Sequence, residues 1–221
     1  MCGIAGLWLK TKIPTQDQVK GMITALQHRG PDGDGVHIEG GLSMIHVRLA
    51  IIDVNGGHQP LFDDRGNSLI VNGEIYNYIE LRSQFNTYPF KTHSDCETIF
   101  PLYQQFGEDF TKHLRGMYAV SLYDKSKNTL YLARDPFGIK PLYYAETPEG
   151  LIYASEPQAI LATGLLSKEL HSEALSDLMH LRYTTSRETI YKGIFRVLPG
   201  EMLTVKDGVI VGRSHQEALP K

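Results

Sequence analysis

The chain has 221 residues, of which 42% are hydrophobic and 21% charged, and its formal net charge is −3. This composition is ordinary for a globular protein, and the mild acidity excludes a general electrostatic attraction to nucleic acid or to an anionic membrane. No apolar run approaches the ~20 residues of a membrane-spanning helix. Because the apolar start also has no basic leader, we expect a cytoplasmic protein.

The residue types that bind metals and cofactors are sparse. Two cysteines, Cys2 and Cys96, are too few for a disulfide framework or a thiolate metal site. The nine histidines form no metal-type pair with a nearby acid. Glycine-rich phosphate-binding patterns are absent as well. The sequence therefore predicts no metal or other cofactor in this chain.

In chain order, the first expected elements are an apolar strand over 3–9 and a helix over 15–27. A capping box, Thr15 to Gln18, begins that helix, and a second box is expected at Ser94 to Glu97. Further strands are expected over 42–47, 68–71, 117–124, 129–134, 142–145, 151–154, 202–205 and 209–211, and further helices from Asn77, Ser155 and Ser172.

The order of these elements indicates the fold class. Strands in adjacent pairs with grouped helices, rather than strict alternation, predict an α+β fold with antiparallel sheets. We expect residues 1–211 to form one domain. Residues 212–221 are expected to be a polar, loose tail or the beginning of a linker.

Cys2 directly follows Met1 in the sequence. If Met1 is removed, Cys2 carries a thiol and a free α-amine, so a nucleophile and its general base lie on one residue. An α-amine titrates near ~8 and a free thiol near ~8.5, so both exchange protons close to neutral pH. A cysteine at an ordinary frayed terminus is the alternative interpretation.

Asn72 and Gly73 follow the strand expected over 68–71. A glycine lets a substrate carbonyl approach the backbone N–H, and the asparagine amide adds a second donor. Together they could form an oxyanion hole, the set of donors that stabilises a tetrahedral intermediate. An ordinary Asn-Gly turn is the alternative.

Two charged residues complete a candidate binding site. Arg48 follows the strand over 42–47 and could hold a carboxylate through its forked guanidinium, or could form a surface ion pair. Asp95 begins a helix and could hold an ammonium group, or could only stabilise the helix dipole. With Cys2, Asn72 and Gly73, these residues suit one ligand, an amino acid whose side-chain carbonyl is attacked.

The same residues lie within six motifs that occur in order along the chain. The motifs are Cys2–Gly6, His28–Gly33, Arg48–Asp53 with Gln59–Leu61, Asn72–Asn77, Ser94–Asp95, and Arg134–Tyr144. This pattern, which extends from residue 2 to about residue 205, resembles the glutaminase domain of class II (N-terminal nucleophile) glutamine amidotransferases. The resemblance is closest to the asparagine synthetase branch.

The resemblance implies a four-layer αββα sandwich of two antiparallel sheets, as in N-terminal nucleophile hydrolases. It implies hydrolysis of glutamine to glutamate and ammonia through a γ-glutamyl thioester. The residue roles implied by the resemblance are Cys2 as nucleophile, Asn72 and Gly73 as oxyanion hole, Arg48 and Asp95 as ligands of the α-groups, and Glu74 with the main chain near Ile52 as further substrate contacts. The loop 28–33 would border the site, and 134–144 would be structural.

Three departures from the family pattern bear on function. Cys96 stands where Thr or Ser is usual, and Gln158 replaces a usual Lys. The Ser-Gly-Gly-x-Asp-Ser segment of the ATP-binding synthetase domain is absent. ATP and magnesium are therefore expected only in a separate synthetase domain or subunit, and a homodimer is one possible assembly.

The alternatives left open concern the reaction itself. The chain could be a non-catalytic glutamine-binding regulatory module, or another N-terminal nucleophile hydrolase. The acceptor of the ammonia could be aspartate, a sugar carboxylate or another acid.

Overall fold

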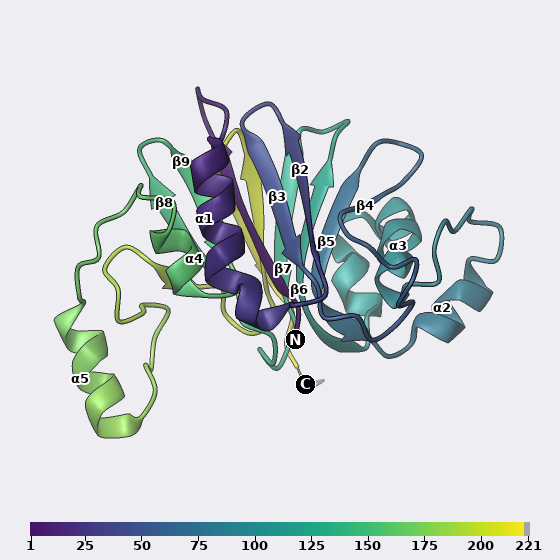
Figure 1. Ribbon diagram of the computed structural model, residues 1–221. Helices are drawn as coiled ribbons and strands as arrows, with labels where there is room; N and C mark the ends of the chain where they lie inside the picture. The colour runs from purple at the N-terminus through teal and green to yellow at the C-terminus, as the bar shows by residue number, and fades with distance from the viewer. Residues whose placement is uncertain (219–221) are drawn as a thin grey trace.

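The computed structural model describes residues 1–218. Two antiparallel sheets of six strands lie face to face, with helices covering the outer face of each (Figure 1). The first sheet has the order β10-β8-β9-β1-β3-β2, and the second has the order β12-β11-β7-β6-β5-β4. This arrangement confirms the predicted α+β class and the αββα sandwich.

The strands of the first sheet are β1 (Gly3–Leu9), β2 (Asp34–Glu39), β3 (Leu42–Val47), β8 (Tyr143–Thr147), β9 (Gly150–Ala154) and β10 (Phe195–Arg196). Those of the second sheet are β4 (Leu61–Phe62), β5 (Ser68–Ile75), β6 (Gly116–Asp124), β7 (Thr129–Arg134), β11 (Glu201–Lys206) and β12 (Val209–His215). The α-helices are α1 (Gln16–Leu26), α2 (Tyr78–Gln84), α3 (Ile99–Phe106), α4 (Pro157–Leu161) and α5 (Ser172–Leu181). Short 3-10 segments are η1 (Gln27–Arg29), η2 (Asp95–Thr98) and η3 (Gly107–His113).

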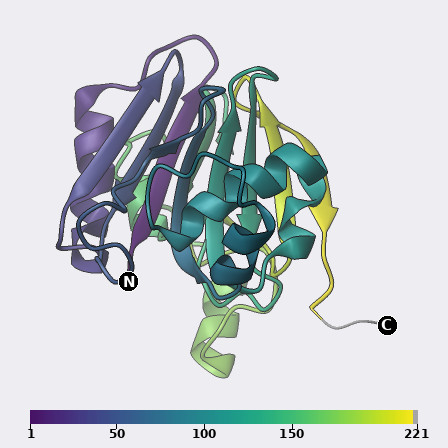
Figure 2. The same ribbon diagram turned by 90° about the vertical axis from the view of Figure 1, so that its right-hand side faces the viewer.

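Apolar side chains fill the three spaces between the four layers. Between the sheets, residues such as Ile4 and Met44 pack against Ile70 and Leu132. A second cluster joins the first sheet to α1 and α4, and a third joins the second sheet to α2 and α3, which face the viewer in Figure 2. Because β1 is covered on both faces, all seven of its residues are buried.

The capping box at the start of α1 forms as predicted. Thr15 Oγ1 accepts from the Gln18 amide at 3.2 Å, and Gln18 Oε1 accepts from the Thr15 amide at 2.9 Å. Val19, Met22 and Leu26 are buried on one face of the helix. The local sequence therefore determines both the beginning of this helix and its buried face.

The second capping box forms only in part, which corrects the prediction. Ser94 Oγ accepts from the Cys96 amide at 3.3 Å, but the Glu97 carboxylate accepts from the amides of Lys91 and Thr92 at 2.6 and 2.8 Å. The helix accordingly begins as the 3-10 segment η2. The Glu97 side chain therefore bonds the preceding turn at residues 91–92 instead of the backbone of Ser94.

Of two other expected helix starts, the one at Ser155 differs in the structure, and the one at Asn77 is confirmed but lacks the side-chain cap. Ser155 does not begin α4, since its hydroxyl accepts from the Ile4 amide at 3.0 Å and the helix begins after Glu156. Asn77 precedes α2, but its side chain bonds the Arg115 amide and the His113 carbonyl rather than the helix. Long-range partners compete successfully with local capping at both positions.

Two strands extend further than the sequence indicated. β5 continues to Ile75, so Asn72 pairs with Ala119 and Gly73 pairs with Tyr118 inside the sheet. The alternative interpretation of these two residues as an ordinary Asn-Gly turn is therefore wrong. β12 continues to His215, which pairs with Glu201, so residues 212–215 are not a loose tail. The last part of the expected tail, 219–221, lies outside the described residues. The domain boundary at 211 itself stays a prediction.

No helix within residues 1–218 is both long and apolar enough to cross a membrane.

Replacing Gly6 by alanine is expected to destabilise the protein by about 3 kcal/mol, because overpacking displaces backbone. A Cβ at Gly6 would lie 2.3 Å from the Ser43 carbonyl oxygen and 2.5 Å from the Tyr153 ring. Urea denaturation measures the loss. The matched control is Gly212→Ala on β12, where the nearest atom to a Cβ is 3.5 Å away; equal denaturation midpoints for the two variants would contradict this packing argument.

Candidate active site

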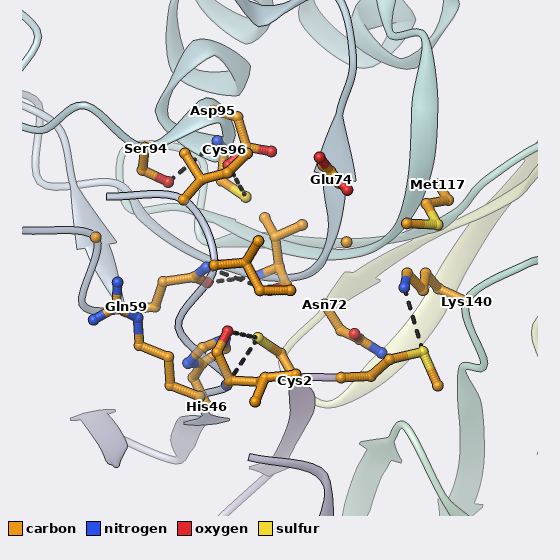
Figure 3. A pocket seen from close by; sticks show the side chains of 18 residues that line it. Cys2, His46, Gln59, Asn72, Glu74, Ser94, Asp95, Cys96, Met117 and Lys140 are labelled. Carbon is orange, nitrogen blue, oxygen red and sulfur yellow. Dashed lines mark hydrogen bonds between the residues drawn. The ribbon is translucent and has the colours of Figure 1, made fainter. Parts of the chain in front are cut away.

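All the catalytic and substrate-binding residues that the sequence predicted line one cleft. It encloses about 600 Å³ of space, including solvent at its mouth. Its lining includes Cys2, Arg48, Ile52, Asn72, Gly73, Glu74 and Asp95. These residues come from the start of β1, the loop that follows β3, the end of β5 and the start of η2. Figure 3 shows Cys2 and Asn72 on one side of the cleft, with Asp95 and Glu74 across from them.

The Cys2 sulfur is held by backbone groups. Its Sγ accepts from the Leu49 amide at 3.3 Å and lies 3.5 Å from the Leu49 carbonyl oxygen. Arg29 Nε donates to the Cys2 carbonyl at 3.0 Å, and Arg29 Nη1 is paired with Glu156 at 2.7 Å. No imidazole or carboxylate of residues 1–218 bonds the sulfur. Among the described residues, the groups that bond the sulfur are thus backbone groups of Leu49.

Asn72 is buried at the cleft, and its amide nitrogen lies 3.5 Å from Ser155 Oγ. Because Ser155 also accepts from the Ile4 amide, this hydroxyl ties β5 of one sheet to β1 of the other. The packing of β5 against β6 gives a further reason for a glycine at position 73. A Cβ there would lie 2.3 Å from the Met117 carbonyl oxygen of the neighbouring strand.

Arg48 is a buried cation, 6% exposed. Its guanidinium donates to the carbonyls of Val54 at 3.0 Å and Asp53 at 2.6 Å. Among the described residues it forms no ion pair, so the surface ion pair considered from the sequence is not observed. Its backbone bonds Gly33 and Asp32, which places the loop 28–33 against the site as expected.

Asp95 is a buried carboxyl group, 5% exposed. Its Oδ2 accepts from the Ile75 amide at 2.7 Å, and the Cys96 thiol donates to Oδ1 at 3.6 Å. Burial raises the pKa of Asp95 above its ordinary value, and the hydrogen bonds oppose that shift. No cationic side chain in the described part of the chain pairs with it.

The two buried charges are complementary to one kind of ligand. Arg48 and Asp95 carry opposite charges in the same cleft and do not pair with each other in the structure. Buried charges without a partner are costly, and an incoming group of opposite charge relieves that cost. A zwitterionic amino acid carries both of the complementary groups.

Two further residues of the cleft are His46, which the sequence did not point to, and Gln59, which lies in a predicted motif but had no predicted role. Burial, with a smaller contribution from Arg48, lowers the pKa of His46 to about 4, so the imidazole is neutral at neutral pH. Its Nε2 has no hydrogen-bond partner within residues 1–218. Gln59 bonds both the amide and the carbonyl of Val71, at 2.6 and 3.3 Å, which fixes the loop before β4. Period-two alternation on β3 places His46 on the same face as Arg48, and this signal could have found it.

The motif 134–144 has a largely structural role, with one exception. The Arg134 guanidinium donates to the carbonyls of Gly138, Lys140 and Val197, each at 2.7 Å. The buried Asp135 carboxylate accepts from four backbone amides. Lys140, however, lines the cleft.

Within the described residues, no group of three or more His, Cys, Asp or Glu side chains is placed to hold a metal ion.

Comparison with known proteins gives the family. The model of the glutamine amidotransferase domain matches residues 1–216. Asparagine synthetase [glutamine-hydrolyzing] 1 of Bacillus subtilis is 38% identical, covering 99% of this chain and 36% of the relative. Asparagine synthetase B of Escherichia coli is 40% identical, covering 76% of this chain and 31% of the relative. Amidase chyE of Penicillium rubens is 38% identical, covering 85% of this chain and 28% of the relative.

Two solved structures share the fold. A glutamine phosphoribosylpyrophosphate amidotransferase from B. subtilis matches with a TM-score of 0.68 at 23% identity, over 98% of this chain and 49% of that one. An allosteric regulatory enzyme of purine biosynthesis matches with a TM-score of 0.70 at 24% identity, over the same shares. This chain spans between 25% and 42% of the length of the first three curated relatives. From the family match over nearly its whole length, the chain belongs to the class II glutamine amidotransferase domain family and corresponds to the glutaminase half of asparagine synthetases.

Proposed function

We propose that this chain hydrolyses L-glutamine to L-glutamate and ammonia, with Cys2 as the nucleophile. The observation that carries the proposal is the pair of buried, unpaired charges, Arg48 and Asp95, in the same cleft as the Cys2 thiol. The glutamine α-carboxylate would bind Arg48 and the α-ammonium would bind Asp95. Glu74 and the main chain near Ile52 would contact the substrate between these groups.

The proposed reaction begins when the free α-amine of Cys2 accepts the thiol proton. The thiolate attacks the γ-carbonyl carbon, and the Asn72 amide and the Gly73 N–H stabilise the resulting oxyanion. The tetrahedral intermediate collapses as the α-ammonium returns a proton to the leaving nitrogen, which releases ammonia and leaves a γ-glutamyl thioester. Water, deprotonated by the same α-amine, then hydrolyses the thioester to glutamate and the free thiol.

Ammonia released in this way needs an acceptor. We propose an ATP-dependent synthetase domain or subunit as the partner, on the basis of the longer asparagine synthetases that the chain resembles. Aspartate is the first candidate acceptor, and a sugar carboxylate or another acid is the alternative. ATP and magnesium would bind in that partner, and this chain would need no cofactor of its own. A homodimer and a cytoplasmic location belong to the same proposal.

Replacing Cys2 by alanine is expected to reduce glutamate release from glutamine at least ~1000-fold, because no other nucleophile takes its place. A steady-state glutamate assay on protein whose N-terminus has been read by mass spectrometry measures this. A thermal-shift titration with glutamine is the control, since the variant keeps Arg48 and Asp95 and should still bind. Binding without any Cys2-dependent release in the parent protein would instead favour a non-catalytic glutamine-binding module. Full activity with Met1 still attached would rule out the amine as base.

A further inference from the structure

Lys140 is the cationic residue of the cleft that the proposed reaction does not use. It is 5% exposed, and its Nζ contacts Met1 Sδ at 3.4 Å. Figure 3 shows its amine reaching into the cleft on the same side as Asn72 and Cys2. Within residues 1–218, Lys140 forms no ion pair. Lysines are almost never this buried without a partner, so a role in the cleft would account for its position.

The chain around Lys140 is held rigidly. Its amide donates to Asp135 Oδ2 at 3.0 Å, and its carbonyl accepts from Arg134 Nε at 2.7 Å. Asp135 and Arg134 also bind Gly138 and Ile139 in the same loop. The hydrogen bonds that make this motif structural therefore also fix the place from which the Lys140 side chain enters the cleft.

We propose that Lys140 is a positioning residue whose ammonium keeps the free α-amine of Cys2 in its neutral, proton-accepting form. The inference rests on the proposed glutaminase function. Met1 is joined to Cys2 by one peptide bond, so standard bond lengths place Lys140 Nζ at most ~10 Å from the Cys2 nitrogen. Removal of Met1 frees that nitrogen and takes away the sulfur that Nζ contacts.

The physical effect is repulsion between like charges. An ordinary α-amine, with a pKa near ~8, is mostly protonated at neutral pH and is then no base. A fixed positive charge nearby disfavours the ammonium form. At ~10 Å and an effective dielectric of ~20, the repulsion amounts to about one pH unit.

Other charges around the Cys2 nitrogen do not supply this effect. Arg29 bonds the Cys2 carbonyl, but Glu156 compensates its charge at 2.7 Å. His46 is neutral at neutral pH because burial lowers its pKa. Asp95 and Glu74 lie across the cleft from Cys2 (Figure 3), and four backbone amides donate to the Asp135 carboxylate. The charges of Arg48, Asp95 and Glu74 are all retained in a Lys140 variant, so a comparison with the parent isolates Lys140. Two cations that line the cleft, Arg48 and Lys140, have no ion pair within residues 1–218. Arg48 donates to the carbonyls of Asp53 and Val54, whereas the Lys140 amine contacts Met1.

The test is the pH profile of kcat/KM for glutamine, whose acidic limb reports the base of the free enzyme. In Lys140→Met the limb is expected to move up by about one pH unit, so kcat/KM falls roughly tenfold at pH 6.5 and stays near the parent value at pH 9. Lys140→Arg keeps the charge and should keep the parent profile. Lys10→Met is the control, since the side-chain amine of Lys10 donates to the exposed Pro148 carbonyl, away from the cleft.

Two results would overturn the inference. One is a loss of the same factor at every pH in Lys140→Met, which a merely structural role predicts. The other is an unchanged limb. If the parent protein shows no Cys2-dependent glutamate release, the proposed function fails instead. Competitive labelling of the free α-amine with acetic anhydride across pH, in the Cys2→Ala background with and without Lys140→Met, measures the same shift without turnover.

Discussion

Replacing Arg48 by methionine is expected to raise the KM for glutamine about 100-fold and to change kcat far less, because a charged hydrogen-bonded contact made equally in the ground and transition states is lost. The two carbonyls to which Arg48 donates, those of Asp53 and Val54, lie on the loop between β3 and β4, which also lines the cleft, so a part of the loss would come from that loop. Initial-rate kinetics over a wide range of glutamine concentration measure both constants.

Asp95→Asn is the matched variant at the other end of the substrate. Asparagine keeps the size of the side chain and an oxygen for the Ile75 amide, but it removes the negative charge, so a similar rise in KM is expected. Analogues of glutamine that lack either the α-carboxylate or the α-amine separate the two roles. Arg48→Met should lose the preference for the carboxylate, and Asp95→Asn should lose the preference for the amine. Equal losses of both preferences in both variants would mean general damage to the cleft.

Acid is expected to destabilise the protein through His46. The pKa of His46 is about 4 in the folded protein because the ring is buried, whereas an unfolded histidine titrates near ~6.5. Between these values only the unfolded chain binds the proton, so the free energy of unfolding falls as the pH drops below ~6.5. The loss approaches about 3 kcal/mol near pH 4 and does not increase below that value.

His46→Gln should remove this part of the acid sensitivity, since an amide does not titrate. Urea denaturation of the parent and the variant between pH 7 and pH 4 isolates the contribution, because carboxyl groups contribute equally to both proteins. His28→Gln is the control, as the His28 side chain is 61% exposed. Parallel stability curves for the parent and His46→Gln would show that the imidazole does not titrate in the folded protein as its burial implies.

Secondary-structure elements that depend on residues close together in the chain form as the sequence predicts. The α1 capping box and the hairpin of β6 and β7 depend on residues close together in the chain, so the local pattern determines them. Where a polar side chain has several possible partners, the local pattern failed. Glu97 binds upstream amides, and Ser155 binds β1 rather than beginning a helix. When several donors are available to one side chain, the hydrogen bond forms with the donor that lies nearest in the folded chain. The distances between the groups are therefore fixed by the fold and cannot be taken from the local sequence.

The residues of the cleft likewise fall into those that the sequence identified and those that only the tertiary structure revealed. Residue types and their order along the chain identified Cys2, Arg48, Asn72 and Asp95 as one chemical set, since nucleophile, charge pair and amide donor each have few functional interpretations. The pairing of β1 with β3 in one sheet, and the stacking of that sheet on the sheet that contains β5, decided that these residues share one cleft. The pairing of β5 with β6 decided that Asn72 and Gly73 lie in a strand. Tertiary structure alone also brought in His46 and Lys140. Their roles depend on burial and on neighbours far away in sequence, and the free energy of a buried charge is a property of its surroundings.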